Sequence, residues 1–339
     1  MPKRLKTVKK IFLAVVFALA ASLSASGRVV KVVGSEITHS AVSEDKLRRQ
    51  VEFLSDSLCD GRAIGTKGSC EAAFWIMRHF SRLGFLPTGG TFNHSFIAPG
   101  GQIGRNICGI LPGSGRSGKH SYILVTAHYD GLGTLDGRLF PGADSNASGV
   151  VAMLGVADML RSMNRFGKIY GRSILFVALD GKNAGMSGSS YLWRMLSRGD
   201  MTDPRNGQPI TASDISLMVN IDQIGSSMSP INPKRKDYLI QLSDGPADFH
   251  RGALRQANEK YGTGLDLCFD YYGSPDFTRL FYRRVSDQKI FLENGIPAVM
   301  FTSGITMNNN KPADTAASLD YSVFKKRIWL IFHWLERII

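Results

Sequence analysis

The sequence predicts an α/β protein: a three-layer α/β/α sandwich around a central mixed, mostly parallel sheet. Two observations indicate this class. Short apolar runs rich in Val, Ile and Leu alternate along the chain with amphipathic stretches, which is typical of α/β folds. The apolar runs lack the polar alternation of half-exposed strands, so we expect helices to cover both faces of the sheet.

The predicted elements follow each other from about residue 50 to the C-terminus. Helices are expected at residues 51–55, 71–83, 147–163, 188–197 and 319–338, and buried strands at residues 121–127 (SYILVTA), 173–179 (SILFVAL) and 216–221 (SLMVNI). Residues 238–242, 247–261 and 297–302 continue the alternation. No internal repeat interrupts the series, so we expect one domain over residues 27–339.

Composition is that of a globular protein. Of the 339 residues, 43% are hydrophobic and 20% are charged, which excludes a disordered chain. The formal net charge is +13. Removing the five basic residues of segment 1–26 from the total of 41 leaves 36 basic against 28 acidic residues, or +8. No dense Lys/Arg stripe with interleaved aromatic residues is present, so no nucleic-acid partner is expected.

Residues 1–26 have the organisation of a signal peptide. A basic stretch ends at Lys10, an apolar run covers residues 11–23, and the small residues Ser24, Ala25 and Ser26 offer a cleavage region. The apolar run is too short to span a bilayer comfortably, although an uncleaved anchor is the alternative. We therefore expect an exported protein, periplasmic or secreted, with no stable membrane span after cleavage.

Four cysteines bear on the expected redox chemistry. An exported protein permits disulfides, and Cys59 and Cys70 flank a glycine-containing loop, so they are plausible partners. Cys108 stands in an apolar stretch and is expected to be a small buried side chain. No Cys-x-x-Cys spacing indicates a structural zinc site.

Polar side chains stand where three predicted strands end. They are His128 and Asp130 after the first strand, Asp180, Lys182 and Asn183 after the second, Asp222 after the third, and Asp144 in the loop behind the first. Ligand sites of such sheets lie at the carboxyl ends of the strands. Imidazole nitrogen and carboxylate oxygen are suitable zinc ligands, so His128, Asp144 and Asp222 together predict a metal site.

An ordered set of motifs resembles the family-28 metallopeptidases. The motifs are AHYDGLG, PGADSNASGV, FVALDGKNAGMSGS, NIDQIG, ENGIPAVMF and KPADT, preceded by FLSDSLCDGRAIGTKGS. This family contains zinc exopeptidases, with two metals bridged by one carboxylate, and glutaminyl cyclases are relatives. The resemblance covers most of residues 45–339 and implies the zinc-exopeptidase fold.

The resemblance also implies roles for particular residues. In the family a His, a bridging Asp and a later Asp hold the first metal, and these positions are His128, Asp144 and Asp222 here. Asp130 corresponds to an acid that orients the ligand His and raises its basicity without binding the metal itself. One zinc ion is therefore expected, held by three protein ligands.

The second half of the family's site is missing. Two consecutive glutamates follow the second strand in the family: the first is the general base and the next binds the second metal. Lys182 and Asn183 occupy these positions. Asn310 stands where the family has its last ligand His, before Pro-x-Asp-Thr, and Gln288 replaces a further His after Ser-Asp. No acid lies between Asp180 and Asp200, and His333 in the last predicted helix is the only His after residue 250.

These replacements lead to two expected functions. The first is a catalytically impaired pseudopeptidase that binds peptide-like ligands, because the base and the second metal are both lost. The alternative is an exopeptidase or amide hydrolase that works with a single zinc. One hypothesis explains the replacements: the Lys182 ammonium stands in for the lost metal beside Asp144, while the amides of Asn183 and Asn310 donate hydrogen bonds there.

Overall fold

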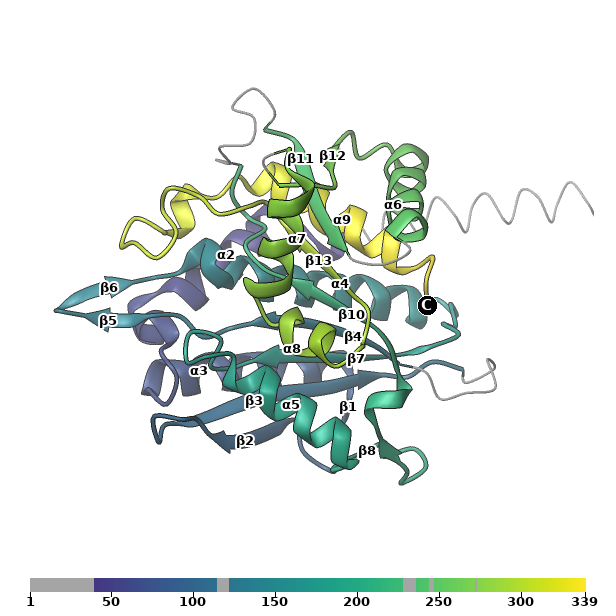
Figure 1. Ribbon diagram of the computed structural model, residues 1–339, viewed down its shortest axis with the longest axis horizontal. Coiled ribbons are helices and arrows are strands. Elements are labelled where there is room, and N and C mark those ends of the chain that lie inside the picture. Colours follow the sequence, from purple (N-terminus) through teal and green to yellow (C-terminus); the bar gives the residue numbers. More distant parts are fainter. Residues whose placement is uncertain (1–39, 115–121, 228–235, 244–246, 272) are drawn as a thin grey trace, which may run out of the picture.

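The computed structural model describes residues 40–114, 122–227, 236–243, 247–271 and 273–339, which form the predicted three-layer sandwich (Figure 1). The main sheet of this part of the chain has nine strands. They are β1 (Leu86–Pro87), β2 (Asn93–Ile97), β3 (Ile103–Leu111), β4 (Tyr122–His128), β7 (Ser173–Leu179), β10 (Ile215–Ile221), β11 (Tyr238–Ser243), β12 (Asp266–Cys268) and β13 (Ala298–Thr302). Their order is β1-β3-β7-β4-β10-β13-β11-β12, and β2 pairs with β3.

The centre of this sheet is parallel, and its flanks are mixed. Strands β7, β4, β10 and β13 run in one direction. Strand β3 is antiparallel to β7, and β11 is antiparallel to β13. The carboxyl ends of the four central strands therefore meet at one edge of the sheet, which is where the polar residues were predicted to gather.

Helices cover both faces of the sheet, as Figure 1 shows. One layer contains α2 (Glu44–Ser55), α3 (Lys67–Leu83), α4 (Ser148–Arg165), α6 (Ala247–Tyr261) and α9 (Tyr321–Leu335). The other contains α5 (Ser187–Arg198), α7 (Pro275–Arg284) and α8 (Gln288–Glu293). Alternate residues of β4 enter different cores: Ile123 and Val125 pack with the first layer, and Tyr122 and Leu124 with the second. Both faces being covered explains why the strands are uniformly apolar.

Helix α4 follows the loop that carries Asp144 and is buried over most of its length. All its residues from Ser148 to Leu160 are buried. A helix that is apolar on all sides is one packed on all sides, and α4 contacts the sheet together with α2, α3 and α9. Its N-terminus is thereby fixed below the carboxyl ends of the strands.

Strand β3 was not predicted from the sequence. Glycines and polar residues interrupt its apolar pattern, but each has a structural reason. The side chain of Asn106 donates to the carbonyl of Gly188 at 2.8 Å and accepts from the amide of Asp180 at 3.1 Å. Gly109 faces aromatic rings, since a Cβ there would meet Phe80 at 2.9 Å. The strand therefore depends on contacts that no local pattern reveals.

The predicted pairing of Cys59 with Cys70 is wrong, because both are free thiols in this structure. Cys59 is buried, and burial raises the pKa of its thiol to about 11. Cys108 is fully buried, as predicted. His333 is a buried residue of α9, and its ring stacks on Tyr261 with 3.5 Å between centroids.

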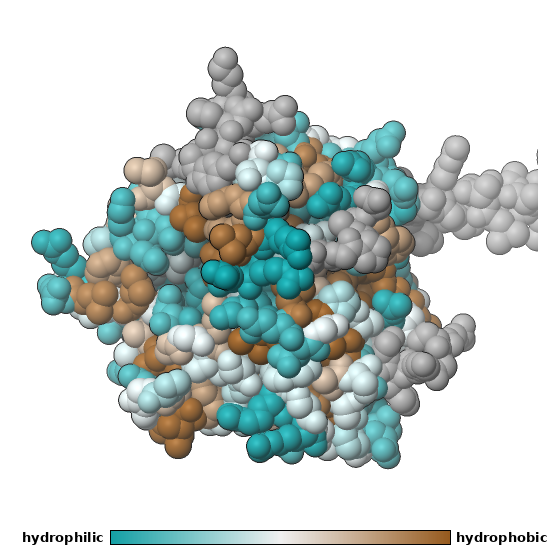
Figure 2. Space-filling view, viewed as in Figure 1, coloured by the Kyte–Doolittle hydropathy of each residue, from teal (hydrophilic) through white to brown (hydrophobic). Residues whose placement is uncertain are grey.

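The predicted signal peptide, residues 1–26, lies outside the described residues. Within the described ranges, no helix combines the length and apolar character that crossing a membrane requires. The face shown in Figure 2 carries hydrophilic and apolar side chains interspersed with each other.

The packing of α4 generates a stability prediction. Leu154 is fully buried in this helix, so Leu154→Ala should lower the free energy of unfolding by about 2–5 kcal/mol through lost burial and a residual cavity. The control is Leu135→Ala, because Leu135 is 47% exposed in β5 (Gly133–Leu135), and it should change stability by less than about 0.5 kcal/mol. Urea unfolding measures both. Equal losses would contradict the central position of α4.

Candidate metal centre

The carboxyl ends of three parallel strands bring predicted site residues to one edge of the sheet. His128 is the last residue of β4, and Asp180 and Asp222 directly follow β7 and β10. Strand β4 lies between β7 and β10 and is parallel to both, so these positions are neighbours. All three side chains are buried.

His128 is held between two aspartates. Its Nδ1 lies 3.1 Å from the backbone oxygen of Asp130 and 3.3 Å from the Oδ1 of that residue. Its Nε2 lies 3.5 Å from the Oδ1 of Asp222. Burial lowers the pKa of His128, but the negative charge of nearby Asp222 and the contact with Asp130 outweigh burial and raise it to about 9. The ring is thus oriented on one side by Asp130 and faces Asp222 on the other.

Asp144 reaches the site from η2 (Ala143–Ala147), the segment that leads into α4. Its Oδ1 accepts hydrogen bonds from the Ser148 hydroxyl at 2.9 Å and from the amides of Gly225 and Ser226 at 2.8 and 3.3 Å. Burial, followed by the charge of Asp314, raises the pKa of Asp144 to about 6. One carboxylate oxygen is therefore fully engaged by the protein.

Each of the three predicted ligands keeps one buried polar atom without a hydrogen-bond partner. These atoms are Nε2 of His128, Oδ2 of Asp144 and Oδ1 of Asp222. Such atoms are costly unless something binds them. The 3.5 Å between His128 Nε2 and Asp222 Oδ1 also suits zinc, since two ligands of a tetrahedral zinc lie about 3.3–3.5 Å apart. The donor chemistry of the trio fits zinc.

The trio is nevertheless not assembled into a finished metal site. Among the residues that the structure describes, no group of three or more His, Cys, Asp or Glu side chains lies close enough to hold a metal ion. His128 and Asp222 are close together, whereas Asp144 does not complete such a group. The assignment of His128, Asp144 and Asp222 as zinc ligands stays a prediction.

Lys182 and Asn183 begin the turn that follows β7, and Asp130 holds this turn. The Asp130 carboxylate accepts from the backbone amides of Lys182 and Asn183, each at 2.9 Å, and from the Asn183 side-chain amide at 3.1 Å. The expectation that Asn183 donates to Asp144 is therefore wrong. Its amide is drawn to Asp130 because that buried carboxylate needs donors.

The Lys182 side chain carries its charge into the site. Burial lowers the pKa of Lys182, but the charges of Asp222, Asp287 and Asp130 outweigh it and raise the pKa above its usual value. The same ammonium and the charge of His128 outweigh the effect of burial on Asp222 and hold the pKa of that carboxyl well below its usual range. The positive charge of the ammonium thus offsets part of the negative charge of Asp222, Asp287 and Asp130.

Asn310 occupies an exposed loop position with a left-handed backbone, at φ 56°. It lines a small pocket near Asp144 together with Gly142, Ser145 and Asp314. Because Asp144 Oδ2 has no hydrogen-bond partner, the expected hydrogen bond from Asn310 to that oxygen is absent. The prediction that Asn310 donates to Asp144 is wrong for this reason.

Two further residues, Asp314 and Arg62, hold the Asp144 loop, and no role was predicted for either from the sequence. Asp314, in the KPADT motif, accepts from the backbone amides of Asp144 and Ser145 at 2.7 and 3.0 Å. The buried guanidinium of Arg62 donates to the carbonyls of Tyr129, Pro141 and Gly142 at 2.7, 2.9 and 2.8 Å. Their only sequence signal was their place in motifs that resemble the family.

A buried polar network supports Asp222 from the side of α8. The Ser286 hydroxyl donates to Asp222 Oδ2 at 2.6 Å, and the Asn220 amide donates to both Ser286 Oγ and Gln288 Oε1 at 3.0 and 2.8 Å. Gln288 is fully buried, and its own amide donates to the carbonyl of Tyr282 at 2.6 Å. Gln288 therefore has a structural role here.

Comparisons with known proteins agree with this architecture. The family model described as Peptidase family M28 matches residues 106–335. The aminopeptidase YwaD of Bacillus subtilis is 29% identical over 162 residues, which cover 48% of this chain. The matched region spans only 30% of the length of that relative.

Solved structures share the fold at low sequence identity. A glutaminyl cyclase from Macrostomum lignano has a TM-score of 0.67 at 14% identity, and the match covers 89% of this chain and 91% of that one. BSAP, a zinc aminopeptidase from Bacillus subtilis, has a TM-score of 0.62 at 16% identity, with coverage of 87% and 95%. Both support the α/β/α architecture.

The site generates a prediction on pH-dependent stability. Asp287 is fully buried, and burial raises the pKa of its carboxyl to about 6 against the effects of His128, Lys182 and a 2.7 Å hydrogen bond from Ser189. The folded protein accommodates the protonated carboxyl of Asp287 better than the ionised one. This stabilisation is complete below the pKa of the same carboxyl in the unfolded chain, about 3.9, and it is lost as the pH rises through the pKa in the folded protein. Relative to Asp287→Asn, the wild type should lose about 2 kcal/mol of unfolding free energy between about pH 4 and pH 7.

Urea unfolding at several pH values measures this difference. Asp200→Asn is the matched control for the amide substitution itself, because Asp200 is exposed. A constant difference for Asp287→Asn would show that Asp287 is ionised throughout this range.

Proposed function

This chain belongs to peptidase family M28, and from that premise we propose that it is a catalytically impaired member that binds peptide-like ligands. The proposal rests on Lys182, which by resemblance occupies the family's general-base position, and whose pKa is raised by the charges of Asp222, Asp287 and Asp130 despite burial, so that its ammonium stays charged. A charged ammonium has no lone pair with which to take a proton from water. A general base typically contributes about 10²–10⁴-fold to the rate, so its loss impairs hydrolysis severely.

The other replacements support the same conclusion. Asn183 stands where the family binds its second metal, and its side chain is engaged by Asp130. Asn310 stands at the family's last ligand position, on an exposed loop. Neither amide resembles the carboxylate and imidazole that zinc prefers. The second metal position has therefore lost both ligands that it does not share with the first.

The ligand class rests on the family. Relatives with this fold are named as aminopeptidases and glutaminyl cyclases. A member with an intact scaffold and a lost base retains the means of binding peptide-like ligands. We place the protein outside the cytoplasm, because residues 1–26 combine a basic stretch with a short apolar run.

A second function, hydrolysis with a single zinc, is favoured by one observation. His128, Asp144 and Asp222 each keep a buried polar atom without a partner. When bound by three protein ligands, zinc lowers the pKa of its water to about 7. His128 and Asp222 would hold the ion from the strand ends and Asp144 from the α4 side, while Asp130 orients the His128 ring.

Zinc stoichiometry decides between these functions. The purified protein is dialysed against trace zinc and its zinc is measured by elemental mass spectrometry. One zinc per chain that is lost in His128→Ala supports the single-zinc hydrolase and justifies a substrate screen. Absence of zinc leaves the metal-free binding protein. His333→Ala is the control, because His333 lies in α9 and should not affect zinc.

Restoring the family's residues tests the assignment of the lost positions. The triple variant Lys182→Glu, Asn183→Glu, Asn310→His should bind one more zinc than the wild type, since it returns two ligands and the base. It should also gain aminopeptidase activity on short peptides. The control replaces the same three residues by Gln, which offers neither carboxylate nor imidazole. If the restored variant folds but binds no additional zinc, the assignment of these three positions is wrong.

A further inference from the structure

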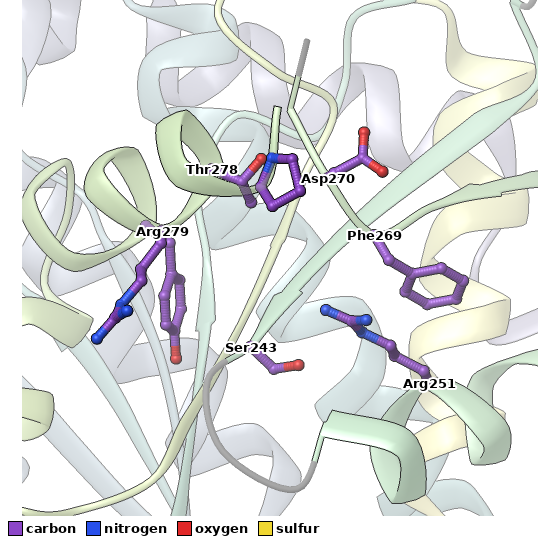
Figure 3. Close-up of a pocket in the computed structure, with 8 residues that line it drawn as sticks. Ser243, Arg251, Phe269, Asp270, Thr278 and Arg279 are labelled. Carbon is purple, nitrogen blue, oxygen red and sulfur yellow. The ribbon is translucent and has the colours of Figure 1, made fainter. Parts of the chain in front are cut away.

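A second cavity lies away from the candidate metal centre, between β11, α6, β12 and α7 (Figure 3). Its volume is about 250 Å³. The residues that line it are Ser243, Arg251, Phe269, Asp270, Pro275, Thr278, Arg279 and Tyr282. This volume is somewhat below the ~300–1,000 Å³ of sites for drug-sized ligands, so it suits a ligand of about the size of one amino acid.

The sheet register separates this cavity from the metal centre. Ser243 ends β11 and pairs with Val299 near the start of β13, and Val299 pairs with Val219 of β10. Val219 lies three residues before Asp222, which corresponds to about 10 Å along the strand. The cavity is also displaced sideways by two strand spacings of about 4.8 Å each. It is therefore a site of its own.

Two polar groups at the cavity are buried and unsatisfied. The hydroxyl oxygen of Ser243 and the Nε of Arg251 are both shielded from solvent, and neither has a hydrogen-bond partner. The hydroxyl of Thr278, by contrast, already donates to the backbone carbonyl of Ser274 at 2.7 Å. Buried donors without acceptors are rare in folded proteins and indicate that something binds there.

The arrangement of these groups is directional. Figure 3 shows the Ser243 hydroxyl and the Arg251 guanidinium directed toward the same space at the floor of the cavity. The guanidinium lies over the ring of Phe269, 5.5 Å from its centroid, and this contact limits its freedom to turn away. Both are hydrogen-bond donors, and one of them is a permanent positive charge. A negatively charged hydrogen-bond acceptor would satisfy both donors.

The other walls restrict the ligand further. Phe269, Pro275 and Tyr282 present apolar surface around the donors. In Figure 3 the Arg279 guanidinium lies on the opposite side of the cavity from Arg251, so one cation, that of Arg251, lies beside Ser243. Among the described residues that line the cavity, Asp270 is the only acid, and its carboxylate points outward. A single cation suits a singly charged anion better than a phosphate, which carries about −1.5 to −2 charges.

We propose that this cavity binds the carboxylate of an amino-acid-sized ligand, with Arg251 and Ser243 as its donors and the apolar walls around its side chain. The guanidinium fork matches the two oxygens of a carboxylate, and the hydroxyl adds a further donor. A free amino acid and the C-terminal residue of a peptide both carry this chemistry. The inference does not depend on whether the metal centre is active.

Isothermal titration calorimetry on the purified protein tests the proposal. The probe is N-acetyl-L-leucine, which has one carboxylate, an apolar side chain and no free amine. It should bind, and N-acetyl-L-leucinamide, which lacks the charge, should bind at least about tenfold more weakly. N-acetyl-Ala-Ala-Leu distinguishes the two sources: binding equal to that of the single residue assigns the site to peptide ends, and weaker binding assigns it to free amino acids.

Three variants locate the binding. Arg251→Gln should lower the affinity for the probe about tenfold or more, and Ser243→Ala should lower it severalfold, because each substitution removes one hydrogen-bond donor. Arg255→Gln is the matched control: Arg255 lies one turn further along α6, is exposed, and its guanidinium is 4.6 Å from the centroid of the same Phe269 ring, but it does not line the cavity. Its affinity should equal that of the wild type. Thermal unfolding of all three confirms that they fold.

Several outcomes overturn the proposal. They are equal binding of the acid and the amide, undiminished binding in folded Arg251→Gln, an equal loss in Arg255→Gln, and no binding of the probe at all. Inorganic phosphate that binds more tightly than the probe and depends on Arg251 also overturns it, because the site is then one for phosphate.

Discussion

Buried negative charge at the carboxyl ends of the central strands is the constraint on which the site depends. Asp130, Asp144, Asp180, Asp222 and Asp287 are all buried there. Isolated buried carboxylates are very unfavourable, so each needs a cation or several donors. The metallopeptidases that this chain resembles meet that need with two metal ions. Here His128 and the ammonium of Lys182 supply positive charge beside Asp222.

Backbone amides provide much of the remaining compensation, and this explains the local folding of the loops. Asp130 holds the turn after β7 by accepting two consecutive amides. Asp144 is held in the same manner by the segment after β10, and Asp314 accepts from the amides around Asp144 itself. Each carboxylate thus fixes a loop while the loop stabilises its charge. These loops are therefore held by contacts to Asp130, Asp144 and Asp314 within the chain itself.

The sequence predicted the parallel centre of the fold because its local signals agree. Strand β7 occupies the predicted range and helix α4 lies within two residues of its own, since an uninterrupted apolar run and a long apolar helical stretch admit one interpretation. Strand β3 was not predicted, because Asn106 and Gly109 interrupt its apolar pattern. Asn106 is needed for its hydrogen bond to Gly188, and Gly109 leaves room for the ring of Phe80, and both partners are distant in the sequence. The Cys59–Cys70 pairing failed because proximity in sequence does not establish the geometry of a disulfide.

For the site, the sequence by itself determined which residue types meet, because parallel strands deliver their carboxyl ends to one edge whatever the details of packing. His128 and Asp222 were found in this way. Only the tertiary structure decided how the charges are matched: Asn183 binds Asp130 instead of Asp144, and Lys182 compensates Asp222. It also produced the cavity of Arg251 and Ser243, whose walls come from β11, α6, α7 and the segment after β12. Side-chain partners depend on distances across the fold, and residue order along the chain does not encode these locally.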